Sequence, residues 1–488
     1  MADALILPRR RRRRTRRELL WALGSRAGLL VLVLAWAAAV AFLASHGQAQ
    51  AAVGLTVAVP VIALVVHNPF NAVLIWALVM PFFVQSPTAE TGMVPWALHR
   101  LMPPVALALV VVHDALGIRR SSFKFSWMDV ALLLFVGIAA VNILYTAANT
   151  QRELVSFYDK VGIPLVFFWL VRAVHPTRTD LTRLVVIGIA TIGVQVLLGI
   201  MSWVAPGMLP SQWLGRAGER TVGTFGGPAP YTITLVLYAL LALHDAWYGS
   251  APVRRIAAFA AVAGALLAVF LSQSRGSWLG AAAAFSGLVI LRPRAVAVIG
   301  IASLVVAGAL ALGPLNDQVA LAQQRIDDEA TVASRLITNE ASVRMIQARP
   351  LSGFGFGNFE RFDESYKRRV TDIPLKLGGS SHNTYLNLVA ELGIPAAVLY
   401  FVPPFVLFTR TVRLRHRLRA ADAAAGALVV VLWLALLDQF LVSNFLEMVH
   451  AYPWGTSLWW ITLGLIASTL QRAHTEDPFG KRRRWALR

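Results

Sequence analysis

Two arginines on loops between apolar segments have side chains suited to holding a phosphate. Arg275 lies in the hairpin Leu-Ser-Gln-Ser-Arg-Gly-Ser, and Arg220 lies in the glycine-rich run Arg-Thr-Val-Gly-Thr-Phe-Gly-Gly-Pro. A guanidinium can donate two parallel hydrogen bonds to one phosphate. Structural explanations also exist: Arg275 can extend to lipid headgroups, and Arg220 can pair with Glu219. Two such arginines beside a membrane suit a pyrophosphate better than either does alone.

His382 is the candidate for proton transfer. It stands in Gly-Gly-Ser-Ser-His-Asn-Thr-Tyr-Leu, where an apolar segment begins. We expect Ser380 or Ser381 to cap a helix whose first turn contains the histidine. The positive end of the helix dipole favours a neutral imidazole, which acts as a base. A histidine at a helix start is also often structural. Asn383 and Tyr385 are supporting candidates.

Acidic residues provide two weaker candidates. The cluster Asp327-Asp328-Glu329 has oxygen ligands for a divalent cation, but a solvated acidic turn explains it more simply, and we predict no metal site. Asp438 lies within an apolar segment, where a carboxylate usually marks a cavity. Asp438 is therefore a secondary candidate for contact with an acceptor.

The region after the acidic cluster predicts a surface helix and a turn. Residues 333–359 show mixed helical spacing of apolar and charged side chains, and Pro350 ends the helix. The following Gly353-Phe354-Gly355-Phe356-Gly357 is not a dinucleotide-binding loop, because no strand precedes it. We interpret it as an aromatic turn that dips into the membrane interface.

Membrane-spanning helices must carry these residues. The chain has 488 residues, of which 57% are hydrophobic and 14% charged, whereas soluble domains carry about 25% charged residues. We predict an all-α polytopic membrane protein with about 12–14 transmembrane helices. The third and sixth candidate segments are short. The fourteen candidates are 27–45, 51–66, 70–85, 97–113, 129–146, 161–174, 184–205, 228–245, 256–272, 276–291, 295–313, 384–409, 423–446 and 453–471.

The basic residues sort to one side of this predicted membrane. With the N-terminus inside, thirty of the 45 Lys and Arg residues fall on cytoplasmic segments and fifteen on outer ones. The net charge of +20 therefore indicates topology, with both termini cytoplasmic, and we expect no nucleic-acid partner. The Arg-rich start is interpreted as a retained anchor, and a cleaved signal ending near residues 49–51 is the alternative. The chain contains no cysteine, which excludes disulfides and thiolate chemistry.

One hydrophilic segment, residues 314–383, is long enough for a small helical subdomain, so we expect the chemistry on the outer side. The predicted division is an Arg-rich cytoplasmic N-terminus (1–26), an N-terminal transmembrane bundle of about eleven spans (27–313), a large extracytoplasmic loop with short helices (314–383), about three C-terminal spans (384–471) and a basic cytoplasmic tail (472–488).

The order of these motifs resembles the O-antigen ligase and polymerase superfamily. The similarity is specific from about residue 215 to 400. As in that family, a glycine, Gly393, follows His382 after ten intervening residues. The ligase subgroup has an Arg followed four positions later by Leu, and Arg325, Arg335, Arg344 and Arg349 lack that Leu. The similar motifs are Arg220-Thr-Val-Gly-Thr-Phe, Ser274-Arg275-Gly276, Arg335, Ala348-Arg-Pro-Leu-Ser-Gly-Phe-Gly355, His382-Asn-Thr-Tyr-Leu386 and Glu391-Leu-Gly393.

This resemblance implies a GT-C-like glycosyltransferase of the cytoplasmic (inner) membrane, with its active site facing outward and no metal or other cofactor. The implied donor is a glycan on polyprenyl (undecaprenyl) pyrophosphate, and the acceptor is a hydroxyl of a glycan, lipid or protein. Arg220 and Arg275 would bind the pyrophosphate, Arg335 would support them, and His382 would activate the hydroxyl. Attack opposite the pyrophosphate predicts inversion of the anomeric centre.

Two other functions stay open. The first is polymerisation of lipid-linked repeat units of O-antigen, capsule or exopolysaccharide. The second is a transporter or flippase, which would predict internal repeats and broken helices around a midplane site. The candidate cations instead gather on outer loops, beside the one large hydrophilic segment.

Overall fold

The computed structural model describes residues 35–83, 93–118, 123–215, 220–249, 251–312, 315, 317–368, 381–445 and 453–475. All regular elements within these ranges are helical, which confirms the predicted all-α fold. The chain separates into two compact units, residues 1–64 and 65–488. In the first unit, the indole of Trp36 in the helix Ala35–Ser45 donates to the carbonyl of Leu55 (3.1 Å). The Arg-rich N-terminus and the last residues of the basic tail lie outside the described residues.

Among the described residues, seven helices are long and apolar enough to cross a membrane, as expected of a polytopic membrane protein. One of them is continuous through three segments, α7, the π-helical η3 and α8. The seven are α6 (Trp127–Thr146), α7 (Thr150–Phe157) with η3 (Tyr158–Gly162) and α8 (Ile163–Val174), α9 (Arg178–Val204), α10 (Pro228–Tyr248), α11 (Pro252–Leu271), α17 (Thr384–Ala421) and α18 (Ala423–Ser443).

Shorter apolar helices accompany them. They include α2 (Ala49–His67), α3 (Asn71–Val79) with η1 (Met80–Phe82), α5 (Met102–Ala115), α12 (Arg275–Leu291) and α13 (Ala295–Leu312). The other elements are α4 (Met93–Arg100), η4 (Pro206–Met208), η5 (Ser211–Trp213), η6 (Gly223–Phe225), α14 (Asp317–Ile326), α15 (Glu329–Ala348), α16 (Phe359–Phe362), η7 (Asp363–Ser365) and α20 (Pro453–Thr475).

Every one of the fourteen predicted segments overlaps a helix, and the largest boundary errors are at the start of the sixth segment and the end of the twelfth. The sixth segment is not short, because its helix begins at Thr150 and has 25 residues. The helix α17 continues past residue 409 to Ala421 and carries the basic residues of the predicted cytoplasmic loop. The number of spans and the five-part division of the chain stay predictions.

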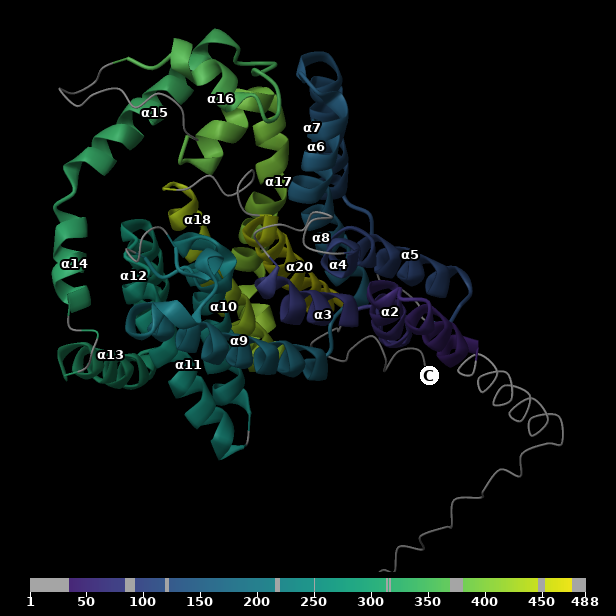
Figure 1. Cartoon of the computed structure of the whole chain (residues 1–488), viewed down its shortest axis with the longest axis horizontal. Helices are drawn as coiled ribbons and strands as arrows, with labels where there is room; N and C mark the ends of the chain where they lie inside the picture. Colours follow the sequence, from purple (N-terminus) through teal and green to yellow (C-terminus); the bar gives the residue numbers. More distant parts are fainter. Residues whose placement is uncertain are drawn as a thin grey trace, which may run out of the picture. The chain divides into compact units, whose positions relative to one another are not determined.

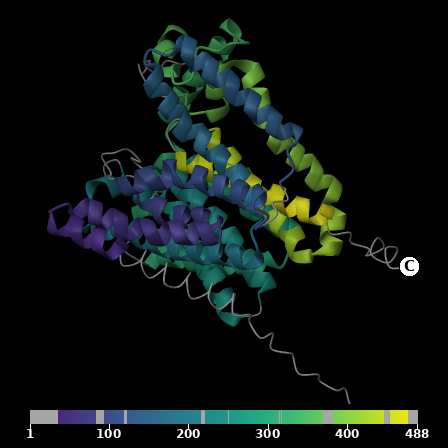
Figure 2. The ribbon, with the colours of Figure 1, turned by 90° about the vertical axis from the view of Figure 1, so that its right-hand side faces the viewer.

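Helix α10 forms the centre of the second unit. Nearly all of its side chains are buried, and it packs against α9, α11 and α18 (Figure 1). Around this centre, α12 packs on α18, α17 packs on α6 and α18, and α20 packs on α8. Figure 2 shows α17 in yellow-green, its neighbours α18 and α20 in yellow, and α6 in blue. These contacts fix the ends of α12, α17 and α18, where several candidate residues lie.

Glycines let α12 approach α18 closely. A Cβ atom at Gly280 would lie 2.4 Å from the Oδ1 atom of Asp438, and one at Gly276 would lie 3.0 Å from the Cβ atom of Phe445. Small residues at such a spacing allow membrane helices to pack by van der Waals contact without intervening side chains. As a consequence, the first residue of α12, Arg275, lies next to the segment that follows α18.

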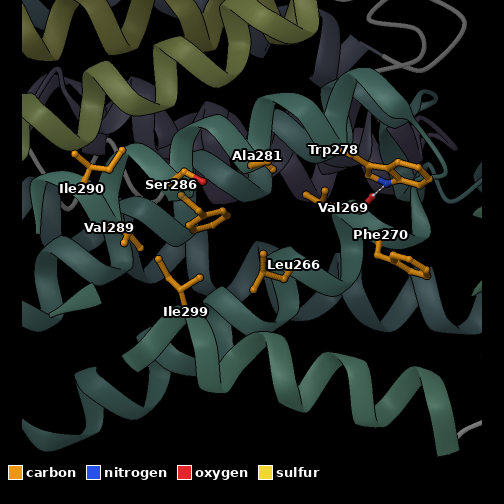
Figure 3. A pocket seen from close by; sticks show the side chains of 11 residues that line it. Leu266, Val269, Phe270, Trp278, Ala281, Ser286, Val289, Ile290 and Ile299 are labelled. Atoms are coloured by element: carbon orange, nitrogen blue, oxygen red, sulfur yellow. Dashed lines mark hydrogen bonds between the residues drawn. The ribbon is translucent and has the colours of Figure 1, made fainter. Parts of the chain in front are cut away.

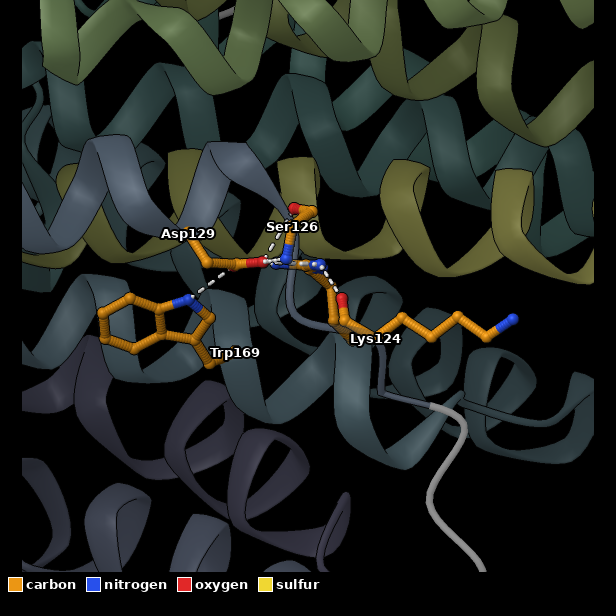
Figure 4. Close-up of polar contacts among 5 residues, drawn as sticks. Lys124, Ser126, Asp129 and Trp169 are labelled. Atoms are coloured by element: carbon orange, nitrogen blue, oxygen red, sulfur yellow. Dashed lines mark hydrogen bonds and ion pairs between the residues drawn. The ribbon is translucent and has the colours of Figure 1, made fainter.

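A buried ion pair joins the first turn of α6 to the last turn of α8. Arg172 pairs with Asp129, and both side chains are almost fully buried. The same carboxylate accepts from the indole of Trp169 (3.0 Å) and from the backbone N–H of Ser126 (2.8 Å), as Figure 4 shows. Such a pair persists in an apolar interior only when further hydrogen bonds satisfy both partners. This cluster therefore fixes the packing of α6 against α8 at the ends of these helices that lie away from His382.

The turn after α15 packs inside the protein, so the predicted contact with the membrane interface was wrong. Helix α15 ends at Ala348, just before Pro350, as predicted. In the turn, Phe354 and Phe356 are buried, and the backbone N–H groups of Phe354 and Gly355 donate to the carbonyls of Ala390 (3.0 Å) and Glu391 (2.8 Å). These bonds attach the turn to α17.

A kink in α17 receives this turn. Gly393 has φ 82° and ψ 166°, which interrupts the helix. A Cβ atom there would lie 2.3 Å from the carbonyl oxygen of Leu351. Only glycine combines this positive φ with so close an approach of another backbone. Two motifs that carry the family resemblance, residues 348–355 and 391–393, are thus in direct contact.

Candidate functional site

Arg275 is held by the junction between α14 and α15. Its guanidinium donates to the carbonyl oxygens of Ile326 (3.3 Å) and Asp328 (3.1 Å). The carboxylate of Asp328 in turn caps α15 by accepting from the backbone N–H of Thr331 (3.2 Å). Arg275 is therefore bound within the protein, which argues against the alternative in which it extends to lipid headgroups.

Arg335 lies beside Arg275 and Arg220. Burial lowers the pKa of Arg335, and the charges of Arg275 and Arg220 lower it further. The charge of Asp328 acts on Arg335 in the opposite direction, so Arg275, Arg220 and Asp328 all lie within electrostatic range of Arg335. The three arginines come from α15, from the first residue of α12 and from the loop before η6. We call Arg220, Arg275 and Arg335 the arginine cluster.

The loop that carries Arg220 is anchored by its neighbours. The backbone N–H of Thr221 donates to the carbonyl of Leu271 (3.0 Å), and the indole of Trp203 donates to the hydroxyl of Thr221 (2.7 Å). The side chain of Gln195, which is fully buried in α9, accepts from the backbone N–H of Thr224 (3.1 Å) and donates to its hydroxyl (2.7 Å). These bonds attach the loop to the helical bundle.

Phe445 contacts Arg335 of the arginine cluster and Gly276, the neighbour of Arg275, and it was not among the predicted site residues. The guanidinium carbon of Arg335 lies 5.8 Å from the centre of the Phe445 ring. The same ring packs against Gly276, next to Arg275. An aromatic face attracts a guanidinium, so Phe445 orients Arg335. The predicted span 423–446 included Phe445, whereas helix α18 ends at Ser443, so Phe445 lies in the segment after the helix.

His382 precedes the helix, which corrects its predicted place in the first turn. Helix α17 begins at Thr384, and Asn383 caps it by accepting from the backbone N–H groups of Tyr385 and Leu386 (both 3.1 Å). The predicted serine cap was wrong for Ser381, and Ser380 lies outside the described residues. An asparagine next to the serines was an equally good cap by residue type.

The backbone at His382 is strained. Its φ of 50° is in the left-handed region, which a residue with a Cβ atom seldom adopts. The turn is held on both sides, because the hydroxyl of the fully buried Ser381 donates to the carbonyl of Asn383 (2.9 Å) and accepts from its N–H (3.2 Å). Backbone strain of this kind is often found at functional sites. The imidazole itself is half-buried.

Helix α18 and the segment after it link the His382 turn to the arginine cluster. Tyr385 packs on Phe440 with ring centres 4.9 Å apart, and its hydroxyl donates to the carbonyl of Phe440 (3.2 Å). Phe445, five residues further on, contacts Arg335 and Gly276. Helix α15, which carries Arg335, also packs against α17. The candidate base and the candidate cations are therefore positioned by the same few elements.

The acidic candidates lie at two separate places in the fold. Asp438 is buried between α18 and α12, with its carboxylate against Gly280. In the predicted cation cluster, Asp328 caps α15 and Asp327 accepts from the side chain of Gln323 (3.2 Å). Among the described residues, no three His, Asp or Glu side chains are grouped as metal ligands.

Residues 232–401 match the family model of the O-antigen ligases. This match confirms the resemblance to the O-antigen ligase and polymerase superfamily and indicates, in general terms, glycosyltransferase-type activity in a multi-pass membrane protein. The matched segment contains Arg275, Arg335 and His382, and Arg220 lies shortly before it. No curated protein matches the chain.

Proposed function

We propose that this membrane protein, with its O-antigen ligase segment, transfers a glycan from polyprenyl pyrophosphate to an acceptor hydroxyl on the outer face of the cytoplasmic membrane. The arginine cluster is the observation that carries the proposal. Three guanidinium groups repel one another, and a bound dianion or trianion relieves that repulsion. A pyrophosphate gains negative charge as the bond to the sugar breaks, so cationic donors placed around it stabilise the transition state.

In this proposal His382 acts as the general base. A positioned base that removes the proton of the attacking hydroxyl contributes about 10²–10⁴-fold to the rate. Asn383 and Tyr385 act as positioning residues, because they fix the turn and the first turn of α17. Attack from the side opposite the pyrophosphate inverts the anomeric centre. Product linkage with retained configuration would exclude this step.

We further propose that the reaction needs no metal, because the arginine cluster provides the positive charge that a divalent cation supplies elsewhere. Unchanged transfer after EDTA treatment is the expected result. Recovery of lost activity on addition of Mg²⁺ or Mn²⁺ would contradict it.

The test is transfer by the purified chain in liposomes, with a polyprenyl-pyrophosphate oligosaccharide as donor. We expect Arg220→Ala, Arg275→Ala and Arg335→Ala each to lower kcat/KM by about 10²–10³-fold, as removal of one charge-stabilising donor does. Arg152→Ala is the matched control, because Arg152 is an exposed arginine at the start of α7, outside the cluster. Equal losses in the control and the cluster variants would overturn the proposed pyrophosphate site.

His382 is tested by two substitutions. We expect His382→Ala and His382→Gly each to lower the rate of transfer by about 10²–10⁴-fold. Glycine adopts a φ of 50° without strain, so His382→Gly should unfold at the same or a higher temperature than the wild type. Loss of activity without loss of stability separates a chemical role from a structural one. Full activity of His382→Ala would refute the base assignment.

Polymerisation of lipid-linked repeat units is the second candidate function, since Arg325, Arg335, Arg344 and Arg349 lack the Leu that follows four positions after an Arg in the ligase subgroup. The same liposomes distinguish them by product. A single modified acceptor indicates a ligase, and a ladder of lipid-linked products indicates a polymerase. Movement of the donor across the bilayer without a new glycosidic bond would indicate a flippase.

A further inference from the structure

The turn between α11 and α12 connects the segments that carry the arginine cluster. We call residues 271–275 the α11–α12 turn. The carbonyl at its first residue accepts a hydrogen bond from the backbone N–H of Thr221, the neighbour of Arg220 (3.0 Å). Its last residue, Arg275, donates to two carbonyls at the α14–α15 junction, which precedes Arg335. The relative positions of the three arginines therefore depend on this turn.

The α11–α12 turn is bonded to both helices that it joins. The indole N–H of Trp278, in the first turn of α12, donates back to the carbonyl of Val269 in α11 (2.9 Å), as Figure 3 shows. The hydroxyl of the fully buried Ser272 donates to the same carbonyl (2.6 Å). The rings of Phe270 and Trp278 stack with their centres 6.2 Å apart. These contacts hold the backbone of the turn in one conformation.

Gln273, at the centre of the turn, binds the start of α14. Its side-chain amide donates to the backbone carbonyl (3.3 Å) and to the side-chain carbonyl (3.4 Å) of Gln318, and both glutamines are buried. Gln318 is the second residue of the ten-residue α14, and Ile326, which Arg275 contacts, is the last. The turn therefore holds both ends of the same helix, and so determines where α15 begins.

Gln273 is unfavourable for stability in two respects. Its φ of 48° is in the left-handed region, where a residue with a Cβ atom is strained. Its buried Oε1 atom accepts no hydrogen bond from the described residues, and a buried polar atom without a partner destabilises a fold. A glycine would remove both disadvantages. Backbone strain of this kind is often found at functional sites, and what this side chain provides is the contact with α14.

We propose that Gln273 is a positioning residue for the pyrophosphate site: it attaches α14 to the α11–α12 turn and so holds Arg335 beside the other two arginines of the cluster. This proposal rests on the proposed function. The three guanidinium groups repel one another, so the cluster needs a support that keeps them together before an anion binds. A site that is assembled in advance binds its ligand more tightly than one that must be ordered on binding.

The experiment measures the affinity of the purified chain for inorganic pyrophosphate by calorimetry. Gln273→Gly removes the amide and relieves the strain, so it should melt at the same or a higher temperature than the wild type. We expect its affinity for pyrophosphate to fall about tenfold, which corresponds to about 1.4 kcal/mol. Gln273→Asn tolerates the left-handed backbone but is one methylene shorter, so it should lose the contact with Gln318 and show the same fall.

Gln324→Ala is the matched control, because Gln324 is an exposed glutamine of the same helix α14. It should leave the affinity for pyrophosphate unchanged. The partner of Gln273 gives a second test. Gln318→Ala removes one of the two acceptors and should lower the affinity about threefold in the wild type but not in Gln273→Gly, because substitutions that act through one contact are not additive.

Four results would overturn the proposal. The first is wild-type affinity for pyrophosphate in Gln273→Gly, and the second is an equal loss in Gln324→Ala. The third is the same effect of Gln318→Ala in both backgrounds. The fourth is a melting temperature of Gln273→Gly well below that of the wild type, since the side chain would then serve stability.

Hydrogen exchange separates a failure of this proposal from a failure of the proposed function. The backbone amides around the α14–α15 junction, including that of Thr331, should exchange faster in Gln273→Gly than in the wild type. If the proposed function fails, the wild type transfers no glycan, yet exchange still reports whether the turn holds α14. If only the positioning role fails, the wild type transfers glycan, and Gln273→Gly matches it in exchange and in pyrophosphate affinity.

Discussion

Asp328 connects the arginine cluster to the first turn of α15 through two different groups. Its carbonyl oxygen accepts from Arg275 (3.1 Å), while its carboxylate accepts from the backbone N–H (3.2 Å) and the hydroxyl (2.5 Å) of Thr331. The hydrogen bonds from Thr331 lower the pKa of this carboxyl below its ordinary 3.8, and the charges of Arg275 and Arg325 lower it further. One residue thus fixes both, with its side chain holding the helix start and its backbone carbonyl holding the cation.

The lowered pKa predicts a specific effect of acid. A carboxyl whose pKa is lower in the folded state stabilises the fold above its ordinary pKa and loses this effect as the pH falls through the folded value. We expect Asp328→Ala to cost about 1 kcal/mol at neutral pH, as loss of an N-cap does. The difference in melting temperature between wild type and Asp328→Asn should shrink as the pH falls below about 4. Thermal unfolding in detergent at a series of pH values measures both.

Asp327→Asn is the control for this prediction. Asp327 is the exposed neighbour and does not cap the helix. Its substitution should leave the melting temperature within experimental error at every pH. If both variants behave alike, the cap is not responsible.

For single residues, the sequence predicted which side chains could take part in chemistry more reliably than it predicted the contacts of those side chains. Arginines and a histidine on outer loops are visible from their types alone, because a charged side chain beside a membrane needs an explanation. The cap by Asn383 and the contact between Phe445 and Arg335 were not predicted. Several neighbouring residues can cap the same helix, and the partner of an aromatic ring depends on which helices pack together.

At the scale of elements, the contact between α12 and α18 should be sensitive to added volume. We expect Gly280→Ala to destabilise the protein by about 1–3 kcal/mol, because the new Cβ atom would lie 2.4 Å from Asp438 Oδ1 and 2.8 Å from Val442. The double variant Gly280→Ala, Asp438→Ala should recover part of that loss, since the nearest atom is removed. Melting temperatures and transfer activity are the measurements.

Gly300→Ala in α13 is the matched control, because nothing lies within 4 Å of a Cβ atom at that position. It should be neutral or slightly stabilising, as alanine favours a helix. A Gly280→Ala variant as stable as this control would show that the two helices do not pack as closely as described.

Helices were predicted well and their junctions poorly. Long apolar runs are strong signals, because a backbone inside a membrane must satisfy its own hydrogen bonds. The kink at Gly393 and its bonds with residues 350–355 have no comparable signal. They join positions about 40 residues apart, and a glycine within an apolar run is compatible with either a straight helix or a break.

At the scale of the whole molecule, the orientation is directly testable, since the chain contains no cysteine. We predict that Glu364→Cys reacts with a membrane-impermeant maleimide in intact cells and that Arg417→Cys reacts only after permeabilisation. Both positions are exposed, so access is limited only by the membrane. Basic residues of the second half of α17 favour the cytoplasmic side. The reverse labelling pattern would invert the topology and place the arginine cluster inside the cell.

The hydrogen bonds between the turn at residues 350–355 and the kink of α17 also affect the order of assembly during synthesis. The ribosome makes the turn first, yet its partners Ala390, Glu391 and Ile394 are translated later. The turn therefore cannot reach its final packing until the first half of α17 has been made and inserted. Phe445 comes later still, so Arg335 gains its aromatic neighbour only after α18 is complete. A nascent chain stalled before α18 would carry the arginines and the histidine but lack the contact that orients Arg335, which makes completion of the site a late step of biogenesis.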